Sequence, residues 1–144
     1  MPGAPIEALR RVPLFADLAP DELAKVTALF KERRFAAGET VIKEGSGGAA
    51  FFVIESGEAT VTIRGEPRGS LREGDHFGEI ALIDEGARMA TITAATDLVC
   101  QGVTLWEFRP LVQANGAIGW KVMQTLAREL RAAEQALANV RNAS

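Results

Sequence analysis

The hydrophobic pattern changes twice along the chain, from a helical period to short strand-like runs and back to a helical period. After Pro20, apolar residues recur every three to four positions, which predicts one helix over residues 20–33. A proline and two acidic residues suit its first turn, and basic residues suit its last turn, where they complement the helix dipole. The apolar positions are Leu23, Val26, Leu29 and Phe30, and the basic ones are Lys31, Arg33 and Arg34.

From about residue 35 to about residue 106, glycines separate short runs typical of β-strands. Residues 59–63 and 90–94 alternate between apolar and hydroxyl side chains, so each should bury one face. The continuous apolar run over residues 51–54 suits a strand covered on both faces, and residues 65–69 suit a turn between neighbouring strands. Many short strands at this interval predict a sandwich or jelly-roll barrel.

The last segment, over about residues 107–140, is helical again. Its apolar residues follow a heptad spacing: Met123, Leu126, Leu130, Ala133, Leu137 and Val140. This pattern fits an amphipathic helix that lies across the barrel, and it also fits a helix that pairs with a second copy in a dimer. The spacing leaves both interpretations open.

Composition narrows the class of protein. The 144 residues fit one domain over 1–144, and 47% apolar with 24% charged residues is typical of a packed globule. A net charge of −3 disfavours direct nucleic-acid binding. The sequence has no run that would span a bilayer and no signal peptide, so we expect a cytoplasmic protein. One cysteine and one histidine argue against a disulfide framework, a metal site and metal-dependent cupin chemistry.

Candidate chemistry lies in the run Phe77–Ile83 and the following Arg88–Thr91. A carboxylate at Glu79 can accept hydrogen bonds from ribose hydroxyls, and the fork of Arg88 matches paired phosphate oxygens. Gly78 and Ala81 carry almost no side chain, so a ligand could approach the backbone there. The alternative is that Glu79 and Arg88 form an ordinary structural ion pair.

The spacing and residue types of this run closely resemble the phosphate-binding cassette of the cyclic-nucleotide-binding domain family. The resemblance extends from about Leu14 to Leu130 and includes Pro13-Leu14-Phe15 and the glycines at 38, 45, 57 and 74. It implies a mainly β fold with flanking helices: a jelly-roll barrel with an N-terminal helix and a long C-terminal helix.

The resemblance also implies roles for individual residues. Glu79, with the Gly78 backbone beside it, would accept the ribose 2′-hydroxyl, and Arg88 would bind the cyclic phosphate. The backbone N–H groups of Ala81 and Ala90 would be further phosphate donors. The implied ligand is cyclic AMP, less favourably cyclic GMP, with no other cofactor. The ligand-binding set is Phe77, Gly78, Glu79, Ile80, Ala81, Arg88, Met89 and Ala90.

Met89 departs from the pattern, because many relatives carry Ser or Thr after the arginine. The missing hydroxyl favours cyclic AMP over cyclic GMP, although the thioether could also narrow the pocket, or simply pack beside a strand. A lid over the nucleotide would come from the last helix, with Leu126, Arg128 and Leu130 as candidates.

Four other residues are assigned structural positions. His76 has no candidate catalytic partner and is interpreted as a turn residue. Cys100 lies in an apolar run and is expected in the core. Trp106 and Trp120 could stack on adenine, but their places at helix beginnings favour core packing.

Three functions of different classes follow. The leading hypothesis is a non-enzymatic sensor that converts cyclic AMP binding into movement of its C-terminal helix. Because the sequence ends at Ser144, without an output domain, we expect a stand-alone module that signals to an unidentified protein partner or through a homodimer. The second is a ligand-free scaffold of the same fold that dimerises through the heptad face. The third, a cupin-type enzyme, is disfavoured because one histidine cannot build the usual metal site.

Overall fold

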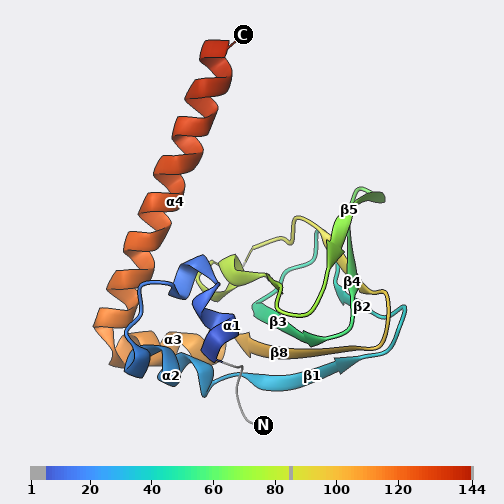
Figure 1. Ribbon diagram of the computed structural model, residues 1–144, viewed down its shortest axis with the longest axis horizontal. Coiled ribbons are helices and arrows are strands. Elements are labelled where there is room, and N and C mark those ends of the chain that lie inside the picture. Colours follow the sequence, from blue (N-terminus) through green and yellow to red (C-terminus); the bar gives the residue numbers. More distant parts are fainter. Residues whose placement is uncertain (1–5, 85, 144) are drawn as a thin grey trace.

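The computed structural model describes residues 6–84 and 86–143 and arranges their strands in two antiparallel four-stranded sheets, with helices gathered at one end (Figure 1). Sheet A has the order β1-β8-β3-β6 and sheet B the order β2-β7-β4-β5. The strands are β1 Lys31–Phe35, β2 Thr40–Ile42, β3 Ala50–Ser56, β4 Ala59–Ile63, β5 Glu66–Leu71, β6 His76–Phe77, β7 Thr91–Ala94 and β8 Leu98–Thr104. The predicted mainly β jelly-roll with flanking helices is confirmed, with the difference that the barrel is not closed.

The helices lie before, within and after the strand region. They are α1 Ile6–Arg10, η1 Pro13–Phe15, α2 Pro20–Thr27, η2 Glu79–Leu82, α3 Leu105–Ala114 and α4 Gly116–Ala143. Figure 1 shows α1, α2 and α3 at one end of the sheets, and α4 starting beside them and extending far beyond the rest of the molecule. The predicted C-terminal helical segment therefore consists of two helices, which separate at Asn115.

Two hydrophobic cores lie on opposite faces of sheet A. On the helical face, Phe51 packs edge-on against Phe15 and Phe30, with ring centroids 6.0 and 5.9 Å apart. On the face toward sheet B, Phe52 and Ile54 pack with Cys100. Because alternate residues of β3 serve different cores, all of residues 51–54 are buried, as their continuous apolar run predicts.

The predicted helix over residues 20–33 is wrong in its second half. Helix α2 ends at Thr27, and Phe30 inserts into the core, so the chain turns and Lys31 begins the edge strand β1. The strand pairs antiparallel with β8, from Lys31 opposite Gly102 to Phe35 opposite Leu98. Exposed charged side chains suit an edge strand, and backbone pairing with β8 outweighs the local helical pattern.

Smaller corrections concern the strand region. Its strands run from Lys31 to Thr104, earlier at both ends than the predicted limits of about 35 and 106. The expected turn over 65–69 lies at Arg64 and Gly65, which both have positive φ, and the following residues form β5. The two predicted alternating strands are β4 and β7, and in β7 the apolar Ile92 and Ala94 are buried while the threonines are half-buried.

The structure contradicts the predicted burial of the two tryptophans and confirms that of the cysteine. Core packing of Trp106 and Trp120 is wrong, because each is 60% exposed. Cys100 lies in the core as expected, and burial raises the pKa of its thiol to about 12. The thiol therefore stays protonated and unreactive at neutral pH.

Candidate functional site

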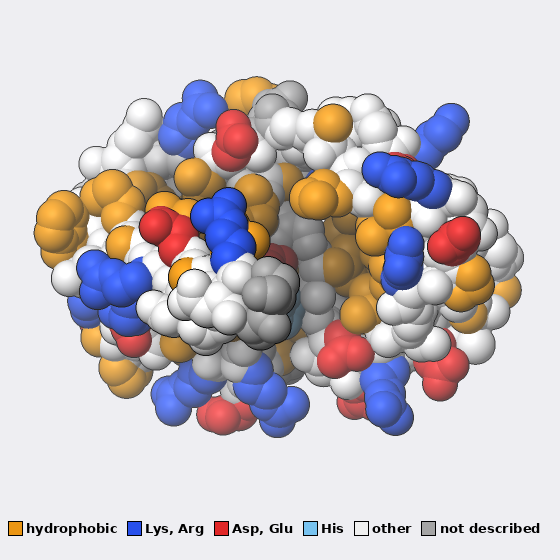
Figure 2. Space-filling model, turned by 90° about the horizontal axis from the view of Figure 1, so that it is seen from above, with side chains coloured by type: hydrophobic (Ala, Val, Ile, Leu, Met, Phe, Trp, Pro, Cys, Tyr) orange, Lys and Arg blue, Asp and Glu red, His pale blue; other side chains and the backbone are white. Residues whose placement is uncertain are grey.

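A cavity of about 470 Å³ lies between η2 and the end of sheet B, and it collects the residues of the proposed cassette. All of the ligand-binding residues named from the sequence line it: Phe77, Gly78, Glu79, Ile80, Ala81, Arg88, Met89 and Ala90. The other lining residues are Ile42, Asp84, Gly86, Ala87 and Ile92. Figure 2, which looks onto the molecule from above, shows a hollow between its helical side and its strand side.

Gly78 shapes the turn at which β6 meets η2. Its φ of +87° is left-handed, and a Cβ atom there would come within 2.7 Å of the Ala50 carbonyl oxygen and 3.0 Å of Arg88 Nη1. Any side chain at this position would be strained and would displace the arginine. Glycine therefore lets the guanidinium of Arg88 lie against the backbone of the cassette.

Arg88 is held by a loop that the sequence interpretation missed. Its Nη2 donates a hydrogen bond of 2.7 Å to the Ala50 carbonyl oxygen, and a Cβ atom on Gly48 would lie 2.2 Å from its Nε. The Arg88 N–H donates to the Ser46 oxygen, and the Gly45 N–H donates to the Arg88 oxygen, both at 2.8 Å. The sequence signal for this loop is the glycine-rich run over residues 45–48, but such a run is also typical of an ordinary turn.

Arg88 is the cationic group of this cavity. Burial lowers the pKa of its guanidinium, but an arginine has so high an ordinary value that it stays charged at neutral pH. A partly buried cation whose fork lies beside glycine backbone is suited to bind an anion.

Glu79 does not form an ion pair with Arg88, so the structural alternative for this pair is wrong. Its Oε2 instead lies 3.6 Å from Nδ1 of His76, which is in strand β6 and not in the predicted turn. His76 lowers the pKa of Glu79, while burial opposes this shift. The carboxylate is thus ionised at neutral pH and faces the cavity as a hydrogen-bond acceptor.

The backbone N–H groups of η2 are engaged within the turn itself. The Ala81 N–H donates to the Gly78 oxygen at 3.1 Å, and the Ile83 N–H donates to the Ile80 oxygen at 3.0 Å. The expected donation from Ala81 to a phosphate would therefore require this turn to open. Met89 is 85% exposed at the cavity, so its interpretation as ordinary packing beside a strand is wrong.

The proposed lid residues on α4 do not line this cavity. Leu126 lines a separate apolar groove of about 250 Å³ with Leu82 of η2 and Phe108 of α3. Arg128 forms an ion pair with Asp17, and Leu130 is exposed. Helix α4 meets the cassette at this groove, where Leu82 also shares a hydrophobic cluster with Val122.

Comparison with known proteins identifies the family. The model of the cyclic nucleotide-binding domain matches residues 32–115, more than half of the chain. The chain belongs to the cyclic nucleotide-binding domain family. The family predicted from the cassette is therefore confirmed.

Several relatives support this assignment. The chain is 45% identical over 92 residues to a cAMP-dependent protein kinase regulatory subunit of Emericella nidulans, in a match that covers 62% of this chain and 22% of that protein. It thus spans about a fifth of the length of that relative. The N-terminal domain of a transcriptional regulator from Streptomyces coelicolor A3(2) is 28% identical, with a TM-score of 0.82 over 90% of this chain and 96% of that one. PfPKA-R (141–441) with bound cAMP is 27% identical, with a TM-score of 0.67 over 94% and 45% of the two chains.

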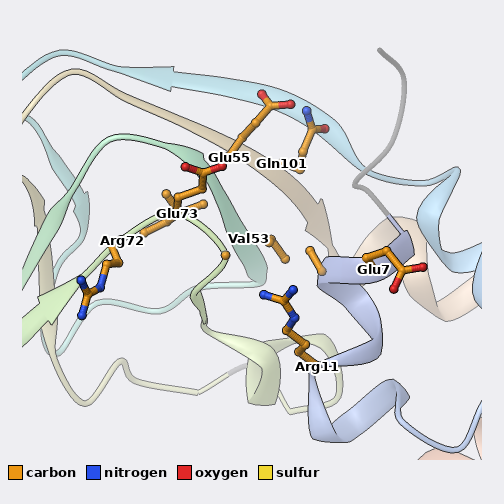
Figure 3. Close-up of a pocket in the computed structure, with 10 residues that line it drawn as sticks. Glu7, Arg11, Val53, Glu55, Arg72, Glu73 and Gln101 are labelled. Carbon is orange, nitrogen blue, oxygen red and sulfur yellow. The ribbon is translucent and has the colours of Figure 1, made fainter.

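This cyclic nucleotide-binding domain has a second and larger cavity, of about 560 Å³ (Figure 3). It is lined by Glu7 of α1 and by Arg11 just after that helix, by Val53 and Glu55 of β3, and by further charged side chains of the segment between β5 and β6. Figure 3 shows Arg11 extending from the end of this helical segment toward Val53. Three carboxylates and two arginines line this second cavity, and carboxylates also outnumber arginines in the lining of the cassette cavity.

Figure 2 shows positive and negative side chains interspersed over the face in view. Within residues 6–84 and 86–143, no group of three or more histidine, cysteine or acidic side chains is placed to hold a metal ion. Of the helices that the structure describes, none combines the length and apolar character needed to cross a bilayer.

Proposed function

We propose that this domain is a non-enzymatic cyclic AMP sensor, with the cassette cavity as its nucleotide site. Arg88 binds the cyclic phosphate and Glu79 accepts the ribose 2′-hydroxyl. A 3′,5′-cyclic nucleotide carries one negative charge and one free ribose hydroxyl, and these two side chains match both features. Relatives named as cAMP-dependent kinase subunits, and PfPKA-R with bound cAMP, support this choice of ligand.

The observation that supports the proposal most strongly is that Arg88 and Glu79 line one cavity but do not form an ion pair with each other. Arg88 hydrogen-bonds a backbone carbonyl, and Glu79 faces His76, so neither uses the other as its partner. Each remains available to a ligand that brings a phosphate and a hydroxyl. Met89 provides no hydroxyl for guanine, which favours cyclic AMP over cyclic GMP.

Helix α4 is the proposed output. Rearrangement of η2 around a phosphate would change the groove that Leu82 shares with Phe108 and Leu126, and this would shift α4. The moved helix would then act on a protein partner. We expect the domain and this partner to be cytoplasmic.

Titration calorimetry of nucleotide-stripped protein with cyclic AMP and cyclic GMP tests the proposal. We expect saturable binding to cyclic AMP that is tighter than binding to cyclic GMP. Absence of binding to either nucleotide would contradict the sensor and favour a ligand-free scaffold. Tighter binding of cyclic GMP would contradict the assigned role of Met89.

Substitution of the two charged residues tests their roles. Arg88→Ala removes charged hydrogen bonds worth roughly 1.5–3 kcal/mol each, so affinity should fall about tenfold to over a hundredfold. Arg68→Ala, at an exposed arginine on β5, is the matched control and should bind normally. Glu79→Ala should weaken binding without loss of the fold, and Glu73→Ala is its control. Thermal unfolding of each variant separates lost binding from lost structure.

A second candidate, the dimerisation scaffold, is favoured by one observation. Met123, Leu130, Leu137 and Val140 of α4 are each more than half exposed although they follow a heptad spacing. A second copy of the helix would cover this stripe. Sedimentation of the protein over a range of concentrations tests it, and a monomer throughout would exclude a homodimer.

A further inference from the structure

His76 lies directly behind Glu79 as seen from the cassette cavity. Glu79 lines the cavity, and His76 does not. Their side chains are three residues apart in the sequence, and the left-handed Gly78 between them turns the carboxylate back toward the imidazole. The imidazole and the proposed ribose acceptor therefore face each other across 3.6 Å.

Packing fixes the position of the imidazole. His76 pairs with Val53 across sheet A, and its ring lies 5.9 Å from that of Phe51 in an edge-on contact. Its Nδ1 is buried and has no hydrogen-bond partner among the described residues. Burying a nitrogen atom without a hydrogen-bond partner costs folding free energy. The acceptor that lies beside this nitrogen atom is Oε2 of Glu79.

Other charged groups lie near His76. Asp75 precedes it, and the carboxylate of Asp75 accepts a hydrogen bond from the Arg72 N–H at 2.9 Å. Just after α1, Arg11 Nη1 comes within 3.5 Å of the position that a Cβ atom on Gly74 would occupy, and Arg88 lies across Gly78. Glu79, by contrast, contacts the imidazole directly.

We infer that His76 is a positioning residue of the nucleotide site, whose protonated imidazole holds Glu79 in place for the ribose hydroxyl. The inference rests on the proposed function. Protonation gives Nδ1 a hydrogen to donate to Oε2, which leaves Oε1 for the nucleotide. It also adds a positive charge near the site of an anionic ligand. Both effects tighten binding as the pH falls.

A pH series of cyclic AMP affinity tests the inference, and the protein must be tag-free because His76 is its single histidine. Imidazoles ordinarily titrate between about pH 5 and 8. We expect affinity to rise about threefold to tenfold from about pH 8 to about pH 6, as for a partly exposed ion pair. Glu79 stays ionised and the cyclic phosphate stays anionic over this range, so neither produces the change.

Two variants separate charge from packing. His76→Gln keeps a donor for Glu79 but cannot be charged, so its affinity should not change with pH and should lie between the affinities of the parent near pH 8 and near pH 6. His76→Phe keeps the packing on Phe51 but has no donor, so it should bind about threefold more weakly than the parent near pH 6, by loss of one modest ion pair. Parental affinity of His76→Phe at both pH values would overturn the inference.

Nuclear magnetic resonance gives a second readout that needs no variant. The single imidazole should titrate at a higher pH with cyclic AMP bound than without it. Equal titration curves, or an affinity that does not change with pH, would overturn the role of His76 and leave the sensor intact. Absence of binding at every pH would overturn the sensor, and this inference with it.

Discussion

The two halves of helix α4 have opposite environments although they belong to one continuous helix. In the first half, Ile118, Val122 and Thr125 are buried against the rest of the domain. From Ala127 to Asn142 no described residue is buried. Figure 1 shows the same contrast, with the beginning of α4 beside the other helices and its end far from them.

The first half is held by close packing and by ion pairs. Gly119 allows a tight approach to α3, because a Cβ atom there would lie 2.7 Å from Cγ1 of Val112. Lys121 pairs with Glu22 of α2, and Arg128 at the boundary pairs with Asp17. The second half has no buried residue from Ala127 to Asn142, and isolated helical segments of this length are marginal in water. One half of α4 is therefore part of the packed domain, and the other half exposes its side chains over residues 127–142.

The largest effect should come from Ile118→Ala, which deletes a side chain that is 1% exposed. We expect the free energy of unfolding to fall by about 2–4 kcal/mol, because the cavity cannot be refilled by its neighbours. Urea unfolding followed by circular dichroism measures it. A loss below about 0.5 kcal/mol, the usual range for surface substitutions, would mean that the first half is not anchored.

The ion pair between Glu22 and Lys121 gives the next effect, and it depends on pH. Lys121 holds the pKa of Glu22 below its ordinary value of 4.5, so the stability from this pair is present above that value and is lost as the pH falls through the lowered one. Glu22→Gln should lower the melting temperature near neutral pH and have little effect in acid. An equal effect at both pH values would contradict the pairing.

Arg128→Ala tests the boundary between the halves. Its pair with Asp17 is about half exposed, so its loss should cost about 1 kcal/mol or less. Hydrogen exchange should then increase in the backbone that follows Arg128 and stay unchanged around Ile118. Faster exchange along the whole helix would place the boundary elsewhere. Arg131→Ala, one helical turn later, is the matched control.

Leu137→Ala should have the smallest effect in the monomer. Its side chain is exposed and the structure gives it no described partner in the core, so the expected change lies within about 0.5 kcal/mol. The same variant should weaken any assembly that covers the stripe. Thermal unfolding at several protein concentrations separates the two, because only an assembly makes the melting temperature depend on concentration.

The strands and the cassette were predictable because their signals are local. The alternation in residues 59–63 and 90–94 and the apolar run over 51–54 each identify a strand, although in β4 Ala59 alone is fully buried. The cassette residues adjoin in sequence and line one cavity, although the position of Arg88 also depends on the loop over residues 45–50.

The errors concern features that distant residues decide. Residues 31–34 form a strand because β8, far along the sequence, is there to pair with them. Gly48 supports Arg88 from a loop whose sequence indicates only a turn. The position of His76 depends on its register opposite Val53. Helix α1 has only 5 residues, which is too short to show a helical period in the sequence. Each of these features depends on tertiary contacts that a sequence pattern does not encode.

The two exposed tryptophans place the intrinsic fluorescence of the chain at the junction between helices α3 and α4. The chain has two tryptophans and no tyrosine, so nearly all of its intrinsic emission comes from Trp106 on α3 and Trp120 on α4. They lie on either side of the break at Asn115, and Arg109 lies 5.6 Å above the ring of Trp106. The β-sheets contribute almost no fluorescence, because they contain neither tryptophan nor tyrosine. A change in emission wavelength when a ligand is added would therefore report a rearrangement of this joint, without any attached dye.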